Sequence, residues 1–228
     1  DIAYMTKEKS DDDAKGNIIK YFSEDPKYSK IELTYQKKPS CPKMINNICN
    51  YIPRTELIIT KLIPLYEEGR CILILSDRRN HLLEIEILLK KYNIECGYYV
   101  GGMKPQALRD AQEKNVILGT FSMASEGMDI PKLNTMILAS PKSDIVQSVG
   151  RILRQKKEKR KFQPLVVDIC DEFSIFTNQS KKRLTYYNRC KYDTTIYEMD
   201  GTNHKYEKTR KKREKKKDKI ENIEECLL

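Results

Sequence analysis

The chain has 228 residues, 39% of them hydrophobic, which is enough to bury a core and argues against wholesale disorder. No apolar run approaches the roughly 18 residues of a membrane span, and no segment at the amino end resembles a secretion signal. The net charge of +10 favours nucleic acid or another polyanion as partner.

The seven cysteines are scattered and include no Cys-x-x-Cys pair. With only two histidines to add, this pattern predicts free thiols in a reducing, intracellular compartment, and neither a metal site nor a disulfide framework. The chain begins with Asp1 and not with a methionine, which we interpret as the sign of a piece of a longer protein.

Composition divides the chain into three parts. Residues 1–28 are polar and are predicted to form a helical or poorly ordered lead-in, residues 29–202 the main domain, and residues 203–228 a basic, helical tail. Within the tail, Lys205 to Lys219 holds ten Lys or Arg against three Asp or Glu. Such a tail either binds a polyanion or is a solvated charged helix, and composition does not separate the two.

Hydrophobic periodicity predicts the elements of the main domain. Lys30 to Gln36 alternates apolar and polar residues, as a half-buried edge strand does. Further strands are predicted at residues 71–75, 94–100, 116–118, 135–138, 165–169 and 194–199, and helices at 45–51, 57–66, 82–89, 105–112, 145–153 and 173–189. Residues 170–173, Cys-Asp-Glu-Phe, are interpreted as a helix cap.

The alternation of strands and helices predicts βαβ units, and therefore an α/β fold with a mainly parallel sheet and helices on both faces. Right-handed crossovers place the loops that enter the helices on one edge of such a sheet, where ligands bind in open α/β folds.

Four polar or flexible positions mark the helix predicted at residues 145–153. Gln147, Arg151 and Arg154 occupy positions i, i+4 and i+7 and share one helix face, and Gly150 leaves room beside them. Two guanidinium groups and an amide suit a phosphate chain, because guanidinium binds phosphate oxygens with two hydrogen bonds. The alternative is an exposed basic helix.

A second cluster, Ser125 to Pro131, follows a buried strand. Gly127 permits a tight turn, Asp129 offers a carboxylate to a sugar hydroxyl or to an arginine, and Pro131 fixes the direction of the exit. A plain turn between two elements is the alternative interpretation.

Together these segments resemble motifs V and VI of superfamily 2 helicases, which lie in the second RecA-like domain of those proteins. Motif VI reads Gln-x-x-Gly-Arg-x-x-Arg, as residues 147–154 do, and motif V ends in Gly-x-Asp-x-Pro, as residues 127–131 do. Residues 72–81 resemble motif IV. The resemblance covers about residues 30–200 and implies a RecA-like three-layer sandwich.

The resemblance also implies roles for individual residues. Arg151 and Arg154 would reach the β- and γ-phosphates of ATP across an interdomain cleft, and Arg154 would be the arginine finger. The remaining ATP-site residues would be Gln147, Gly150, Gly127 and Asp129. The nucleic-acid surface would include Thr120, Ser76, Arg78, Gly101 and Gly102.

The chain departs from the full helicase pattern in one respect. It has no Gly-x-x-x-x-Gly-Lys-Ser/Thr phosphate loop and no Asp-Glu-x-Asp/His magnesium motif. The resemblance therefore implies the carboxy-terminal half of a helicase, monomeric and inert by itself. Its partners would be nucleic acid and an N-terminal RecA-like domain, and that domain would hold ATP and Mg²⁺.

Two segments, Ser76 to Arg78 and Thr185 to Arg189, suggest a finer comparison. They are similar to helicases of large cytoplasmic DNA viruses, namely the poxvirus transcript-release type and its asfarvirus relative. This similarity favours DNA as substrate, a role in transcription, and the host cytoplasm or the virion as location. The alternative functions are a non-catalytic basic nucleic-acid binding module and, disfavoured by the absence of a glycine-rich loop, a Rossmann-like transferase.

Overall fold

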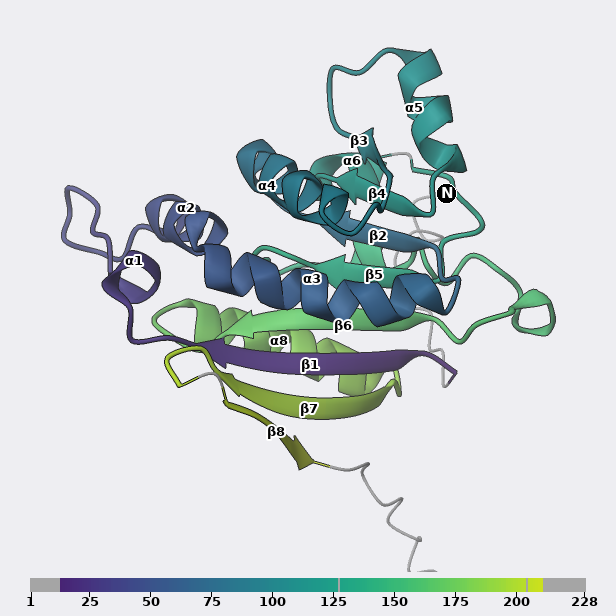
Figure 1. The fold of residues 1–228 in the computed structure, drawn as a ribbon. Helices are drawn as coiled ribbons and strands as arrows, with labels where there is room; N and C mark the ends of the chain where they lie inside the picture. The colour runs from purple at the N-terminus through teal and green to yellow at the C-terminus, as the bar shows by residue number, and fades with distance from the viewer. Residues whose placement is uncertain (1–12, 127, 204, 211–228) are drawn as a thin grey trace, which may run out of the picture.

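The computed structural model describes residues 13–126, 128–203 and 205–210, which form an eight-stranded sheet between two layers of helices (Figure 1). The strand order is β3-β4-β2-β5-β6-β1-β7-β8; the strands from β3 to β7 are parallel, and β8 is antiparallel to β7. The fold class predicted from the sequence is confirmed. The strands are Lys15–Phe22 (β1), Ile72–Leu75 (β2), Cys96–Tyr99 (β3), Val116–Gly119 (β4), Thr135–Leu138 (β5), Leu165–Asp171 (β6), Asp193–Asp200 (β7) and Lys205–Arg210 (β8).

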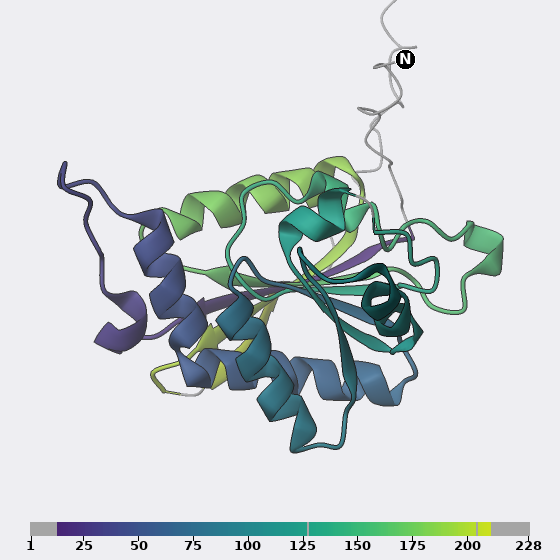
Figure 2. The ribbon, with the colours of Figure 1, turned by 90° about the horizontal axis from the view of Figure 1, so that it is seen from above.

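Helices cover both faces of the sheet, as Figure 2 shows from above. α2, α3 and α4 lie on one face, α6, α7 and α8 lie on the other, and α5 packs beside the edge strand β3. No helix in the described part of the chain is long and apolar enough to cross a membrane. The helices are Pro26–Ser29 (α1), Cys41–Asn50 (α2), Ile52–Glu67 (α3), Arg79–Lys90 (α4), Pro105–Glu113 (α5), Phe121–Glu126 (α6), Val146–Val149 (α7) and Phe176–Arg189 (α8).

The central strands are apolar throughout because each of their faces meets a helix layer. In β2, Ile72 and Ile74 pack into the core beneath α3 and α4, whereas Leu73 and Leu75 pack into the core beneath α6 and α8. All four side chains are fully buried. The short apolar runs in the sequence therefore predicted these strands correctly.

Strand β1 corrects the predicted domain boundaries. It lies inside the sheet, hydrogen-bonded to β6 on one side and to β7 on the other, so residues 15–28 belong to the domain and not to a lead-in. Ile18, Ile19 and Tyr21 are buried in the core. The pattern was missed because these few apolar residues are interspersed with Lys, Asn and Gly.

The predicted tail is also divided differently. Its first part, Lys205–Arg210, is strand β8 and extends the sheet, so the prediction of a helix beginning at residue 203 is wrong there. Residues 211–228 lie outside the described residues.

Three further predictions need correction. The residues between 30 and 40 form a short hairpin with a single bridge between Leu33 and Pro39, and they are not an edge strand of the sheet. The helix predicted at residues 145–153 is the single turn α7, followed by turns through Leu153. Helix α6, which follows β4 at once, was not predicted.

Candidate functional site

The loops that carry the predicted site residues meet at the carboxyl edge of the sheet. They follow β3, β4, β2 and β5, which are consecutive neighbours in the sheet. Hydrogen bonds join the strand ends: the Ser76 amide donates to the Gly119 carbonyl at 3.1 Å, and the Thr120 amide donates to the Tyr99 carbonyl at 3.4 Å. The parallel topology thus brings together segments that are far apart in the sequence.

Arg151 joins the two segments that resemble motifs V and VI. Its Nε donates to the carbonyl of Ala124 at 2.6 Å, its Nη1 to that of Met128 at 3.0 Å, and its Nη2 to that of Ser125. These carbonyls lie in and just beyond α6, where the last carbonyls of a helix have no partner within the helix. Arg151 therefore closes the end of α6, and three of its five N–H groups are used in doing so.

Partial burial lowers the pKa of the Arg151 guanidinium below its ordinary value, and the positive charge of Arg154 adds to this effect. An arginine remains charged under all ordinary conditions, so its bonds to the carbonyls are charge-assisted. They hold the loop after β4 against the segment after β5.

Arg154 forms an ion pair with Asp129 at the surface of the same region. Its Nη1 contacts Asp129 Oδ1, and the two side chains are 32% and 71% exposed. A pair this accessible to water stabilises the fold little. The contact establishes that the Arg154 guanidinium can bind an anionic oxygen at this surface, which fits a phosphate group.

The other predicted ATP-site residues lie in the same region. Gln147 is exposed on α7, and Gly150 follows that helix with a φ of −55°, which any residue can adopt. A Cβ atom at Gly150 would have its closest contact at 3.4 Å, so neither backbone nor packing requires glycine there. Gly127 lies outside the described residues.

Ser76 is fully buried, which argues against its predicted place on a nucleic-acid surface. Its Oγ lies 3.1 Å from His81 Nδ1 and accepts a hydrogen bond from the Arg78 amide at 3.1 Å. His81 Nε2 is 3.3 Å from Thr55 Oγ1, and burial, together with nearby Arg54, lowers the pKa of His81 to about 3. Ser76 and a neutral His81 therefore fix the turn between β2 and α4.

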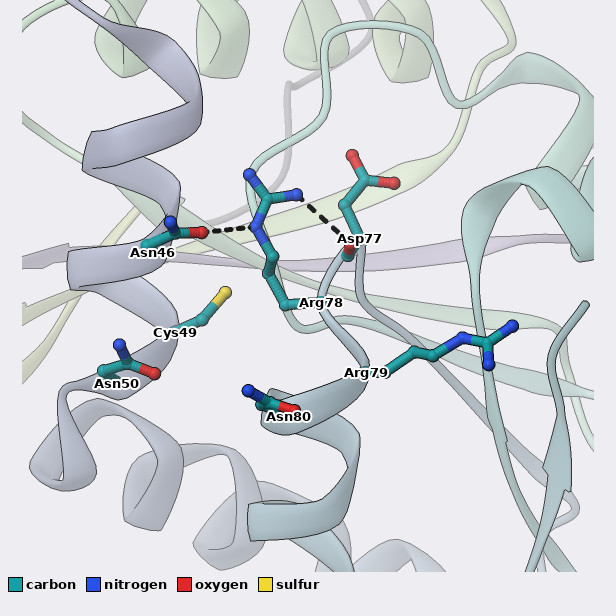
Figure 3. Close-up of a pocket in the computed structure, with 7 residues that line it drawn as sticks. All are labelled: Asn46, Cys49, Asn50, Asp77, Arg78, Arg79 and Asn80. Atoms are coloured by element: carbon teal, nitrogen blue, oxygen red, sulfur yellow. Dashed lines mark hydrogen bonds between the residues drawn. The ribbon is translucent and has the colours of Figure 1, made fainter.

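Arg78 spans the space between this turn and α2 (Figure 3). Its Nε donates to Asn46 Oδ1 at 2.5 Å, its Nη2 to the Pro42 carbonyl at 3.1 Å, and its Nη1 to the Asp77 carbonyl at 3.2 Å. Asp77 in turn forms an ion pair with Lys142 at 3.2 Å. Arg78 thus lies at the predicted surface but is engaged in holding α2.

A hollow of about 310 Å³ lies beside Arg78, between α2 and the first turn of α4 (Figure 3). Its lining combines amide groups, two guanidinium groups and the start of a helix, which together favour anionic ligands. The lining residues are Asn46, Cys49, Asn50, Asp77, Arg78, Arg79 and Asn80. Sequence reasoning missed the contribution of α2, because nothing in a single sequence indicates that α2 packs against the loop after β2.

The remaining predicted nucleic-acid residues lie at neighbouring strand ends. Thr120 precedes α6 and has its Oγ1 3.3 Å from Ser122 Oγ. Gly102 has a φ of +81°, a backbone conformation that residues other than glycine rarely adopt. The carbonyl of Gly101 accepts a hydrogen bond from Arg79, so the turn after β3 is tied to the start of α4.

Two buried ion pairs flank β6 and were not predicted. Arg54 of α3 donates hydrogen bonds to both carboxylate oxygens of Asp171, and neither side chain has any exposed surface. On the opposite face, Arg183 of α8 donates to Asp168 at 2.8 Å. Asp171 therefore lies within β6 as a partner of Arg54, and the interpretation of residues 170–173 as a helix cap is wrong.

The cysteines and the possible metal ligands in the described part of the chain bear on the predicted thiol and metal chemistry. The six cysteines among them are free thiols, and no group of three or more His, Cys, Asp or Glu there is arranged to hold a metal ion. A reducing compartment stays a prediction. Arginines and amides at the carboxyl edge instead form a donor set that suits phosphate groups.

A parallel sheet between two helix layers, with these phosphate-directed loops at its carboxyl edge, is the arrangement of a RecA-like domain. Residues 55–156 match the model of the helicase conserved C-terminal domain. This match confirms the resemblance to a helicase C-terminal domain that the motifs predicted.

Relatives and solved structures agree with this assignment. Over 178 residues, or 75% of the chain, it is 40% identical to a protein of Acanthamoeba polyphaga mimivirus named as an ATP-dependent RNA helicase. It is 29% identical over 48% of its length to an African swine fever virus protein (isolate Tick/Malawi/Lil 20-1/1983) of the same name. The crystal structure of T4 UvsW superposes with a TM-score of 0.65 at 21% identity, over 83% of this chain and 42% of UvsW, which shows the likeness of fold.

The chain spans part of each relative. It covers 33% of the mimivirus protein and 21% of the African swine fever virus protein.

Proposed function

We propose that this domain is the C-terminal motor half of an ATP-dependent nucleic-acid helicase or translocase. The observation that carries the proposal is the Arg151 clamp, which holds the loop after β4 so that Arg154 and Asp129 stand together at the surface. The proposed partner across this surface is an N-terminal RecA-like domain, which would supply the phosphate loop and the residues for Mg²⁺.

Arg154 is the proposed arginine finger. When the two domains close on ATP, its guanidinium exchanges the Asp129 carboxylate for the terminal phosphate, where it stabilises charge in the transition state. Asp129, released from the ion pair, is then free to accept a hydrogen bond from the ribose. Gln147, Gly150 and Gly127 are proposed to complete this half of the ATP site.

The nucleic-acid track is proposed to run along the loops after β2, β3 and β4. Thr120 and the Gly101–Gly102 turn are the candidate contacts to the sugar-phosphate backbone, because hydroxyl and backbone amide groups bind phosphates without reading sequence. In place of the buried Ser76, we propose Arg79 and Asn80, which line the hollow beside α4 and are exposed.

The test of the motor assignment is Arg154→Ala in the full-length protein. Loss of an arginine finger is expected to lower kcat for ATP by at least about a thousandfold, with nucleic-acid affinity nearly unchanged. Arg189→Ala, which removes an exposed arginine at the end of α8, is the matched control and is expected to keep turnover. If Arg154→Ala keeps its kcat, the role assigned to Arg154 is wrong.

The choice between DNA and RNA rests on two opposing similarities. The resemblance to poxvirus and asfarvirus helicases favours DNA, whereas the two viral relatives carry the names of RNA helicases. We propose DNA as the substrate, and stimulation of ATP turnover by single-stranded DNA and RNA of the same sequence tests this choice. Stronger stimulation by RNA would overturn it.

A second candidate function, a basic nucleic-acid binding module, is favoured by the charge of Lys205 to Lys219. A deletion that tests it has to begin at residue 211, because β8 is paired with β7 in the sheet. If affinity disappears with residues 211–228, the tail dominates binding; if affinity persists, the carboxyl edge of the sheet accounts for it. The salt dependence of each protein reports how many phosphates it contacts.

A further inference from the structure

The segment between α1 and α2 forms a defined hairpin that projects from the domain. The Thr34 amide donates to the Lys38 carbonyl at 2.8 Å, the Lys37 amide to the Thr34 carbonyl at 3.0 Å, and the Ser40 amide to the Glu32 carbonyl at 2.7 Å. Lys37, with a φ of 58°, closes the turn. These bonds give residues 30–40 a fixed shape, with Tyr35 at its tip.

The apolar side chains of this hairpin face solvent. Ile31 is 54% exposed, Leu33 47% and Tyr35 103%, which means that the tyrosine ring contacts almost nothing in the domain. Figures 1 and 2 both show the hairpin extending beyond the carboxyl ends of β1 and β6. An ordered, apolar and protruding tip on this edge is suited to contact a partner.

Charge on and near the hairpin indicates which partner fits. Lys30, Lys37 and Lys38 lie on the hairpin with a single acidic residue, Glu32, which is paired with Lys30 at 2.9 Å. An exposed aromatic ring beside lysines is the combination that binds single-stranded nucleic acid, because bases stack on the ring and phosphates pair with the cations. Tyr35 lies two residues from Lys37 and three from Lys38, so that one strand could contact the ring and both lysines.

The base of the hairpin is joined to the candidate nucleic-acid loops. Ser40 is buried, and α2 begins at the next residue. Within the first two turns of α2, the Pro42 carbonyl and the Asn46 side chain both accept hydrogen bonds from Arg78. The hairpin and α2 therefore extend the surface of the loop after β2 outward, past the hollow shown in Figure 3.

We propose that residues 30–40 grip the nucleic-acid strand beyond the motor core, with Tyr35 stacking on a base and Lys37 and Lys38 contacting adjacent phosphates. This inference rests on the proposed function, since it adds a contact to the same track. It assigns a binding role to a segment that precedes the helicase-domain match at residue 55.

The test uses the full-length protein and a single-stranded oligonucleotide that carries 2-aminopurine, whose fluorescence reports stacking. Tyr35→Ala is expected to weaken binding about tenfold and to abolish the stacking signal, whereas Tyr35→Phe keeps both. Tyr92→Ala is the matched control, because Tyr92 is 55% exposed and lies after α4, away from the hairpin. This control is expected to bind as the parent does.

The lysines have a separate readout. Lys37→Asn with Lys38→Gln is expected to lower the slope of log affinity against log salt by about 1.4, since each phosphate contact contributes about 0.7 for a single strand. Asparagine suits position 37 because it tolerates the left-handed backbone there.

Two outcomes separate this inference from the function on which it rests. If the parent binds the oligonucleotide and hydrolyses ATP, but Tyr35→Ala binds equally well, the hairpin proposal is overturned and the motor assignment stands. If the parent shows neither binding nor turnover, both are overturned. An unchanged salt slope in the lysine variant excludes the phosphate contacts.

Discussion

The buried pair of Arg54 and Asp171 offers a quantitative test of what holds the carboxyl edge of the sheet. Arg54 donates to the two carboxylate oxygens at 2.7 and 2.9 Å and to the Ala139 carbonyl at 2.6 Å. The Tyr28 hydroxyl donates to the same carboxylate at 2.8 Å. The pair thus connects α3, β6 and the end of β5, with α1 attached through Tyr28.

Arg54→Met removes the cation and leaves the Asp171 carboxylate buried. Breaking a fully buried pair in this way is expected to lower the free energy of unfolding by about 3–5 kcal/mol. For a domain of this size, this corresponds to a fall in melting temperature of about 6–20 °C. Replacing both partners, as Arg54→Met with Asp171→Leu, is expected to regain at least half of the loss, since no buried charge is left unpaired.

Urea and thermal unfolding of the parent, Arg54→Met, Asp171→Leu and the double variant complete a double-mutant cycle. Lys20→Met serves as the comparison, because the Lys20–Glu198 pair is 3.9 Å long and exposed, and its loss should change stability by less than about 1 kcal/mol. If Arg54→Met costs no more than Lys20→Met, or if the double variant loses the sum of the two single losses, the pair does not act as described.

Three further predictions concern His81, Arg151 and Gly97. The pKa of His81 is about 3 in the folded protein and 6.5 ordinarily, so between these pH values the unfolded chain binds one more proton than the folded chain. The free energy of unfolding should therefore fall as the pH drops from 6.5 toward 3, by up to about 1.4 kcal/mol per pH unit. In His81→Asn, the free energy of unfolding should depend less steeply on pH over this range. In Arg151→Lys, the lysine cannot reach all three carbonyls, and urea unfolding should show a free energy of unfolding lower by about 2–3 kcal/mol. If this variant instead loses ATP turnover while its stability is unchanged, Arg151 contacts phosphate. Gly97→Ala places a Cβ 2.6 Å from the Ala111 backbone, so urea unfolding should show a free energy of unfolding lower by about 1–3 kcal/mol. An unchanged free energy of unfolding would contradict this close contact.

The sheet was largely predictable because burial on both faces leaves a local mark in the sequence. Runs such as Ile72–Leu75 and Leu165–Asp171 are apolar over most of their length, whatever their distant neighbours. Strand β1 was not predictable in this way. Its lysines and asparagine lie among the buried residues, and the two strands that pair with it lie at the other end of the chain.

The candidate site was predictable in position but not in partners. In the structure Arg154 contacts Asp129 and Arg151 donates to the Met128 carbonyl, whereas the ATP-site roles of these residues stay predictions. The spacing did not reveal that Arg151 bonds to three carbonyls, or that Ser76 is buried against His81. Such contacts depend on side-chain direction and on long-range packing, which the residue type does not determine.

The place of β1 in the sheet has a consequence during protein synthesis. Both of its hydrogen-bonding neighbours, β6 and β7, are made long after it, since they begin at Leu165 and Asp193. At the roughly 5–20 residues per second of translation, β1 exists for roughly ten seconds before either neighbour has been synthesised. Its two open edges can pair with other chains throughout this interval. Strand β1 is therefore a place where a nascent chain of this protein depends on protection in the cell.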